Sequence, residues 1–165
     1  MSASNPKESS NNSNNANIPN ASNSGFVSSY LLYLLAAASE AASKQFHARV
    51  REMGLRVPEW RVVACLHDQD GLMVTQLAHF ALMEQSRLTR IIDQMETRGL
   101  VDRRSDEGDG RRVRIYLTDE GQAISAQLVT AAKAHEKQLL KSLPKEDAAH
   151  LKPALIALLN SLEAS

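Results

Sequence analysis

The sequence has little cysteine, few aromatic side chains and no long apolar run. With one cysteine among 165 residues, the chain can form neither a disulfide framework nor a zinc site built on cysteines. No apolar stretch reaches the length needed to cross a bilayer. No basic start followed by an apolar core indicates a secretory signal. We therefore expect a cytoplasmic protein that makes no membrane contact.

Charge of either sign is not in excess either. Acidic and basic side chains balance, so the formal net charge is zero, and any affinity for nucleic acid must come from a local basic patch. Residues 1–24 are dominated by Asn and Ser, which predicts a disordered tail. The remaining residues, 25–165, are enough for one domain with a real core.

The patterns that catalysis and metal binding need are also missing. No nucleophile and base occur in a recognisable arrangement, and there is no phosphate-binding glycine loop. The five histidines are scattered without the paired spacing of a metal site. We expect neither an enzyme nor a bound cofactor or metal. Cys65 lies among apolar residues of an expected helix, which favours an inert thiol; oxidant sensing through Cys65 is the alternative.

The most informative stretch that is present runs from Glu84 to Gly99. Apolar residues recur there at intervals of three and four, which predicts a helix with one buried stripe, Leu88, Ile91, Ile92 and Met95. Gly99 stands where a helix often ends in the left-handed conformation. The outer face of the first turns carries side chains able to bind bases and phosphates, namely Gln85, Ser86, Arg87, Thr89 and Arg90. This combination is typical of a DNA recognition helix.

A basic β-hairpin is predicted directly after this helix. Residues 113–117 alternate between apolar and polar side chains, as in a half-buried strand, and the Asp/Gly-rich segment 105–110 suits a hairpin tip. The helix and the hairpin together outline a winged helix-turn-helix whose wing owes its charge to Arg103, Arg104, Arg111, Arg112 and Arg114. The alternative is a solvated hairpin whose arginines pair with its own acids, Asp102, Asp106, Glu107 and Asp109.

Long helical patterns flank the winged unit, which we place at residues 58–117. One pattern runs from Phe26 to near Gly54, and others occupy much of residues 118–165. These flanking segments, 25–57 and 118–165, carry more apolar surface than a small winged unit can cover. We therefore expect a homodimer formed through them.

Four residues predict where shorter elements start or stop. Pro58 suits the first turn of a helix, and Thr75 is expected to cap a short helix before the recognition helix. Thr118 is the expected cap of the next long helix. Pro153 should kink or interrupt the last helix, because proline removes a helical hydrogen-bond donor.

Several short motifs, in their order and spacing, resemble the MarR (multiple antibiotic resistance regulator) family of bacterial transcription factors. They are Pro58–Val63, Thr75–Ala78, Ser86–Asp93, Arg98–Val101, Asp109–Arg112 and Leu117–Gly121. The resemblance implies a mainly α fold with a small β-hairpin wing and a homodimer with interlocked first and last helices. It also implies a palindromic double-stranded DNA operator and release of repression by a small aromatic ligand.

The resemblance assigns DNA contacts to individual residues. The family's major-groove face corresponds to Ser86, Arg87, Thr89 and Arg90, next to Gln85, and Arg112 belongs to the wing. Arg111 matches a wing-tip arginine that enters the minor groove, where negative potential is concentrated, and Asp109 matches the aspartate that braces this arginine. Arg87 departs from the small hydroxylated residue common at its position, so a different base preference is expected.

A narrower likeness, to regulators of hydroxycinnamate and other lignin-related aromatic catabolism, points to the ligand. The likeness lies in residues 30–35, 46–49 and 58–61. Rings and polar groups for an aromatic ligand would come from Tyr30, Tyr33, His47, Trp60 and Arg61. Each of these residues has an alternative role in packing or at the surface.

Two questions stay open at this level. The ligand is either an aromatic acid or its acyl-CoA thioester, for which Arg49, Arg51 and Arg56 are the nearest cations in the sequence. The function is either ligand-responsive DNA binding or that of a helical interaction module that does not bind DNA. The second interpretation leaves the arginine-rich wing without a role.

Overall fold

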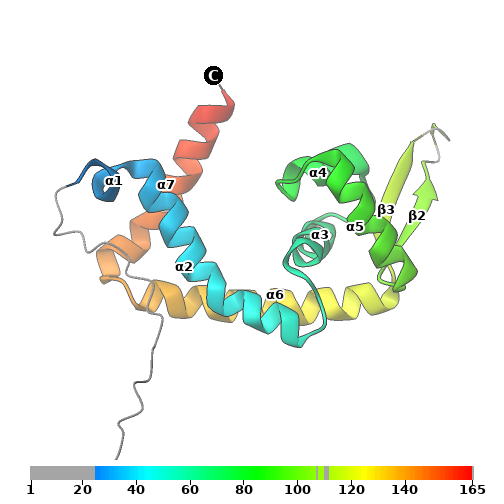
Figure 1. The fold of residues 1–165 in the computed structure, drawn as a ribbon, viewed down its shortest axis with the longest axis horizontal. Helices are drawn as coiled ribbons and strands as arrows, with labels where there is room; N and C mark the ends of the chain where they lie inside the picture. Colours follow the sequence, from blue (N-terminus) through cyan, green and yellow to red (C-terminus); the bar gives the residue numbers. More distant parts are fainter. Residues whose placement is uncertain (1–24, 107, 110–111, 165) are drawn as a thin grey trace, which may run out of the picture. The chain divides into compact units, whose positions relative to one another are not determined.

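The computed structural model describes residues 25–106, 108–109 and 112–164 (Figure 1). Its helices are α1 (Phe26–Ser29), α2 (Leu31–Glu52), α3 (Val57–Asp68), α4 (Val74–Phe80), α5 (Gln85–Thr97), α6 (Asp119–Lys141) and α7 (Lys145–Glu163), and its strands are β1 (Leu72–Met73), β2 (Val101–Ser105) and β3 (Val113–Leu117). This confirms a mainly α fold with a small β component. None of the helices in the described ranges is long and apolar enough to span a membrane.

The chain forms two compact units, Met1–Ala41 and Ala42–Ser165. The expected tail 1–24 lies outside the described residues. In the rest of the first unit, the single helix expected from Phe26 is wrong, because the chain is extended at Tyr30 and α2 starts after it. The hydroxyl groups of Ser28 and Ser29 donate to nearby backbone carbonyls, a local alternative to continued helix.

The second unit contains a three-stranded antiparallel sheet with strand order β1-β3-β2. The predicted hairpin is present as β2 and β3, with Val101 opposite Leu117 and Ser105 opposite Val113. β1 adds a short third strand along the other edge of β3. The sheet side chains Val101, Ile115 and Leu117 are buried, so the base of the wing belongs to the core.

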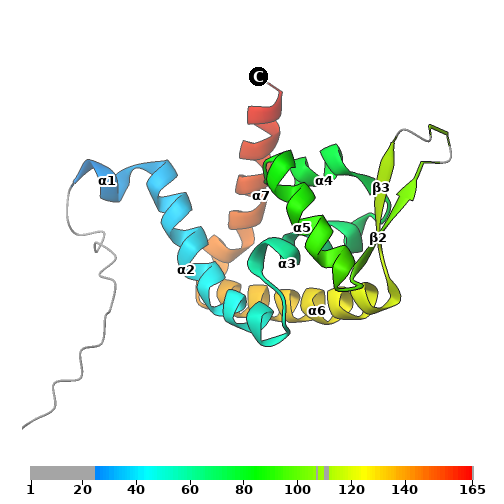
Figure 2. The same ribbon diagram turned by 45° about the vertical axis from the view of Figure 1, so that its right-hand side comes forward.

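The core of the second unit lies between the helix-turn-helix, the sheet and α6. The predicted apolar stripe of α5 is confirmed, since Leu88, Ile92 and Met95 are fully buried. α6 runs along α3 (Figure 2) and contributes Leu128 to the same cluster, as α2 contributes Val50. The ends of the two long helices nearest the winged unit are therefore packed into its core.

Two glycines end helices in the left-handed conformation. Gly54 follows α2 with φ of 76°, and Gly99 follows α5 with φ of 70°. After each glycine the chain bonds back to the last helical turn, as in Leu100 N–H to the Met95 carbonyl at 2.9 Å. This is the Schellman arrangement that satisfies otherwise free carbonyls. The predicted end of the recognition helix at Gly99 is confirmed.

The predicted helix starts are partly right. Thr118 caps α6, and its Oγ1 accepts a hydrogen bond from the Gly121 N–H at 3.1 Å. Pro58 lies in the first turn of α3. Thr75 as a cap is wrong, because α4 starts one residue earlier, at Val74. The Gln76 side chain accepts from the Met73 N–H there at 3.1 Å, which takes the place of a hydroxyl cap.

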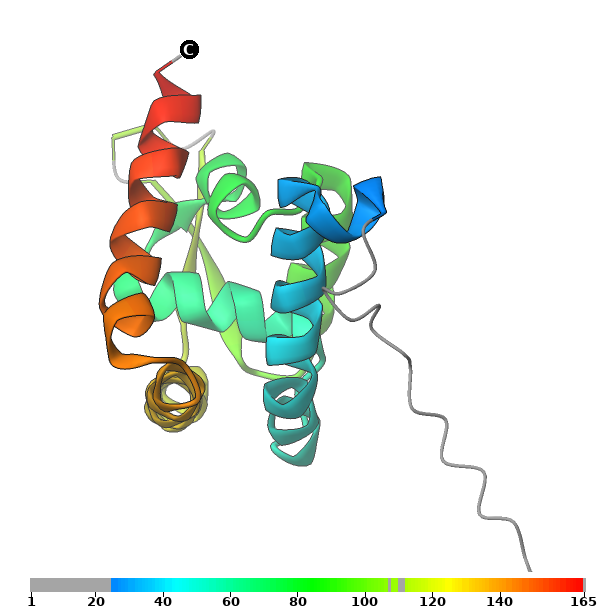
Figure 3. The same ribbon diagram turned by 90° about the vertical axis from the view of Figure 1, so that its left-hand side faces the viewer.

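Helix α7 continues through Pro153 without interruption. An interruption was one of the two outcomes expected for this proline; regular helix on both sides tolerates the single missing donor. Figure 3 shows α6 end-on with α7 leaving its far end. No residue of α7 is buried, and its exposed apolar side chains include Leu151, Ile156, Leu159 and Leu162.

Gly121, in the first turn of α6, touches the backbone of the chain that leaves α5. A Cβ at this position would lie 2.1 Å from the Leu100 carbonyl oxygen, far inside van der Waals contact. The same carbonyl accepts from the Thr118 N–H at 3.2 Å. Glycine is therefore required here for close approach between α6 and the base of the wing.

We expect Gly121→Ala to lower the free energy of unfolding by about 1–3 kcal/mol, because α6 must move away from the Leu100 carbonyl. Chemical denaturation followed by circular dichroism measures this change. Gln122→Ala, at the next and exposed position, is the matched control and should leave stability nearly unchanged. Equal stability of the two variants would show that the close contact is not a constraint.

Candidate functional site

Helix α5 places its polar side chains opposite its buried stripe. At about 100° per residue, Ser86 and Arg90 lie on the side facing away from Leu88, Ile92 and Met95. The predicted contact residues of this helix are all exposed, namely Gln85, Ser86, Arg87, Thr89 and Arg90. The Thr89 hydroxyl donates to the Gln85 carbonyl at 3.0 Å, so toward a ligand it offers its acceptor lone pairs. This face can bind base edges and phosphates at once.

A buried carboxylate fixes the other end of α5. Glu59, in the first turn of α3, has no exposed surface. It accepts from the Arg56 N–H at 2.7 Å and from the Arg56 guanidinium at 2.7 Å. Arg98, just after α5, donates to both Glu59 oxygens at 3.0 Å and to the Gly54 carbonyl at 2.7 Å. The cluster thus joins the start of α3, the end of α5 and the turn after α2.

Burial alone would raise the pKa of Glu59, but the hydrogen bonds from Arg56 and Arg98 outweigh burial and hold the pKa below its usual value. The carboxylate is therefore charged and paired at neutral pH. The sequence motif contained Glu59, but nothing in its spacing indicated that the side chain is buried. Only the contact between α3 and α5 makes this role visible.

The wing is attached to the recognition helix by Arg103 of β2. Its guanidinium forms ion pairs with Asp93 and Glu96 of α5, each at 2.5 Å. Arg103 is therefore a brace between helix and wing, and its charge is neutralised by α5. Sequence reasoning had counted it among the cations of the wing.

Other wing arginines also have acidic partners. Arg114 pairs with Asp106 and donates to the Gly71 carbonyl at 2.8 Å. Arg104 approaches Asp102 at 3.4 Å and lies 4.5 Å from the Tyr116 ring centre. The ion pairs of the solvated-hairpin alternative thus do form. They leave more than half of the Arg104 side chain exposed, so pairing does not remove the cation from the surface.

At the wing tip the assignment of partners stays open. Arg111, predicted to enter the minor groove, lies outside the described residues. Asp109, predicted to brace Arg111, forms an ion pair with Arg112 at 3.2 Å. The Arg112 side chain is 61% exposed, so it remains accessible while paired.

Comparison with known proteins identifies the family. The MarR family model matches residues 55–113. The homoprotocatechuate degradative operon repressor of Escherichia coli is 33% identical over 134 residues, covering 79% of this chain and 90% of the relative. The chain belongs to the MarR family. The crystal structure of a MarR family transcriptional regulator from Silicibacter pomeroyi matches with 58% identity and a TM-score of 0.77, covering 84% of this chain and 98% of that one.

A further MarR-like neighbour carries a ligand. NadR in complex with 4-hydroxyphenylacetate matches at 28% identity and a TM-score of 0.67, over 75% of this chain and 88% of that structure. These relatives are transcriptional regulators, which agrees with the expectation of a regulator over an enzyme. The winged helix-turn-helix of this chain, α4, α5 and the β2–β3 wing, is the DNA-binding element of the MarR family.

Three of the predicted ligand residues lie in the second unit, around the end of α2 and the start of α3. Trp60 contacts Phe46 edge to face, with ring centres 5.2 Å apart, and it packs against the core. His47 and Arg61 are close enough to interact electrostatically. Burial lowers the pKa of His47, and the positive charges of Arg51 and Arg61 lower it further, so the imidazole is neutral near pH 7.

His135 of α6 belongs to the same aromatic cluster and was missed as a ligand candidate. Its ring lies 5.7 Å from Phe46, centre to centre. Its Nε2 is buried and has no hydrogen-bond partner among the described residues. A buried polar atom of this kind needs a partner. The helical period of α6 placed His135 on the inner face, but only the packing of α2 against α6 leaves its nitrogen unsatisfied.

The remaining candidates are distributed differently. Tyr30 and Tyr33 belong to the first unit; Tyr30 stacks on Phe26 at 5.1 Å. Two of the cations considered for a CoA group are already paired, Arg49 with Glu52 and Arg56 with Glu59. Cys65 is half-buried against the core. Its burial raises the pKa of the thiol, as does Asp68, which disfavours the reactive thiolate.

We expect Glu59→Gln to lower the free energy of unfolding by about 1–3 kcal/mol at pH 7, because the paired charge is lost. Since the Glu59 pKa is depressed in the folded state, its contribution is present above the unfolded value of about 4.3 and disappears as the pH falls through the folded value. The difference between the wild type and the variant should therefore shrink in acid. Denaturation series at several pH values measure it; a constant difference would contradict the assignment.

Proposed function

We propose that this protein is a homodimeric, ligand-responsive repressor that binds a palindromic DNA operator through α5 and the wing. The observation that carries the proposal is the exposed polar face of α5, opposite a stripe that is fully buried. Two such helices in a symmetric dimer would address two half-sites of an operator. Family membership and the repressor named among the relatives support this function.

The homodimer is proposed from apolar surface that the single chain leaves uncovered. Within the described residues α7 buries none of its side chains, yet Leu159 is 58% and Leu162 65% exposed. In the first unit Leu31 and Leu32 are more than half exposed as well. Contiguous exposed apolar surface on a helix usually marks an interface, and a second copy of this chain is the partner we propose.

Arg87→Ala should weaken operator binding by about 1–3 kcal/mol and relax the preference at one base pair per half-site, as expected when a base-reading arginine is removed. The measurement is a fluorescence-anisotropy titration with duplexes selected from random DNA. Arg51→Ala, an exposed arginine on α2, is the matched control. If both variants bound with the affinity of the wild type, α5 would not be the reading surface.

For the ligand, we propose a hydroxylated aromatic acid in its free form. Trp60 would stack on the ring, and Arg61 with His47 would bind the carboxylate. The unsatisfied Nε2 of His135 would accept the phenolic proton. The relatives that bear on this chemistry are NadR with 4-hydroxyphenylacetate and the repressor of the homoprotocatechuate operon. The ion pairs of Arg49 and Arg56 favour the free acid over the CoA thioester.

Trp60 is the only tryptophan of the chain, so its fluorescence can report binding directly. We expect 4-hydroxyphenylacetate to quench it more strongly than phenylacetate does at equal concentration. His135→Leu should remove this preference, a loss of about fivefold in relative affinity for one hydrogen bond of about 1 kcal/mol. Arg61→Ala should weaken both ligands equally.

A parallel titration with hydroxycinnamates and their CoA thioesters tests the other ligand class. Tight binding of the thioester alone would overturn the free-acid proposal and leave DNA binding untouched. Oxidant sensing through Cys65 receives no support from its half-buried position and raised pKa. A helical module without DNA binding does not account for the exposed arginines of α5.

A further inference from the structure

Lysines and arginines occupy separate parts of this chain. Every arginine lies between Arg49 and Arg114, whereas five of the seven lysines lie between Lys133 and Lys152. Arginine suits the bidentate contacts of base and phosphate recognition, whereas lysine is a compact point charge that suits small anions. The C-terminal lysines therefore call for an explanation separate from the DNA-binding surface.

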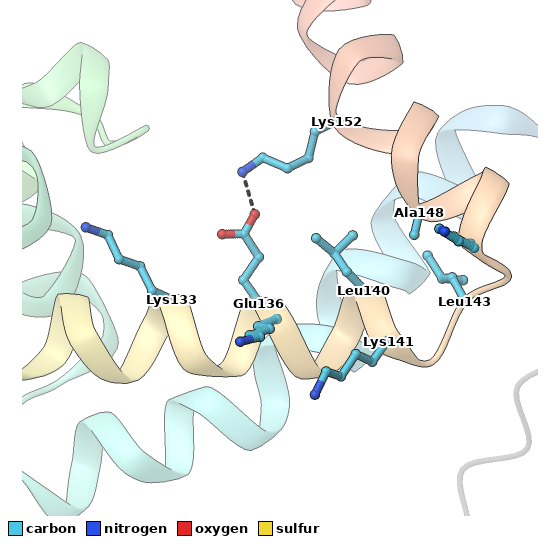
Figure 4. A pocket seen from close by; sticks show the side chains of 9 residues that line it. Lys133, Glu136, Leu140, Lys141, Leu143, Ala148 and Lys152 are labelled. Atoms are coloured by element: carbon cyan, nitrogen blue, oxygen red, sulfur yellow. Dashed lines mark hydrogen bonds and ion pairs between the residues drawn. The ribbon is translucent and has the colours of Figure 1, made fainter.

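These five lysines line one groove, formed by the end of α6, the turn after it and the start of α7. The groove has a volume of about 620 Å³. Its rim consists of Lys133, Lys137, Lys141, Lys145 and Lys152. Its floor is apolar and comes from Leu140, Leu143 and Ala148. Figure 4 shows Leu140 and Leu143 between the side chains of the two helices.

The charge of the groove is strongly unbalanced. Glu136 is its only acidic lining residue, and its carboxylate forms an ion pair with Lys152 across the gap between α6 and α7 (Figure 4). Among the described residues, no carboxylate lies within ion-pair distance of Lys133, Lys137, Lys141 or Lys145. In a chain with zero net charge, four uncompensated ammonium groups around an apolar floor favour a ligand with several negative charges.

We propose that this groove, which we call the lysine groove, binds a small amphipathic phosphate ester. An aromatic or short acyl group would cover Leu140, Leu143 and Ala148, and a phosphate dianion would bind the ammonium groups of the rim. Apolar burial supplies affinity, and the charges supply selectivity for the anion. The lysine groove is distinct from the cluster around Trp60 and from α5, so it would be a second regulatory input to the same protein.

The test uses the full-length protein and 1-naphthyl phosphate, whose own fluorescence reports binding. We expect one site per chain and an affinity that falls as salt is raised. Inorganic phosphate and 1-naphthol, which each keep one half of the probe, should bind at least tenfold more weakly. If inorganic phosphate bound as well as the ester, the groove would be only a diffuse basic surface and the proposal would fall.

Variants locate the site. The double substitution Lys137→Ala and Lys141→Ala should weaken the probe at least tenfold, and the Lys→Arg pair at these positions should retain binding. Lys44→Ala, outside the groove, and Arg61→Ala, in the proposed aryl-acid site, should bind as the wild type does. Unchanged binding by the double variant would refute the proposal, as would a change in its sedimentation coefficient, because the groove would then contact another copy of the chain.

Discussion

The buried carboxylate of Glu59 is the constraint on which the DNA-reading part of the structure depends. A carboxylate removed from water must be paired, and here the pairing groups are Arg56 and Arg98. Because Arg98 also binds the Gly54 carbonyl, one charge holds α3, the end of α5 and the turn after α2 in a single geometry. The direction of the recognition helix follows from an electrostatic requirement as much as from apolar packing.

The same logic extends to the wing and to the ligand residues. Arg103 joins β2 to α5, so helix and wing are held as one body. Trp60, which we place in the ligand cluster, directly follows Glu59 in α3. A ligand that favours one position of Trp60 therefore acts next to the residue that holds α5. Coupling of this kind requires that ligand and DNA prefer different arrangements of the same element.

Charge is divided in this protein by position and by residue type. The arginines of the winged unit are in large part paired with acids of the same unit, and they keep exposed surface for contact with DNA. The lysines after Lys133 surround an apolar groove instead. A net charge of zero thus conceals two basic regions with different chemistry, one suited to a nucleic acid and one to a smaller anion.

Local patterns in the sequence determined the elements of the helix-turn-helix and wing. The period of Leu88 to Met95, Gly99 after it and the cap at Thr118 act within a few residues, and the structure has all three. Contacts between distant segments were decided by tertiary packing alone. These include the buried pairing of Glu59, the space that only Gly121 can fill, and the unsatisfied nitrogen of His135. Periodicity reports which face of a helix is buried, but not which neighbour covers it, because that neighbour is remote in sequence.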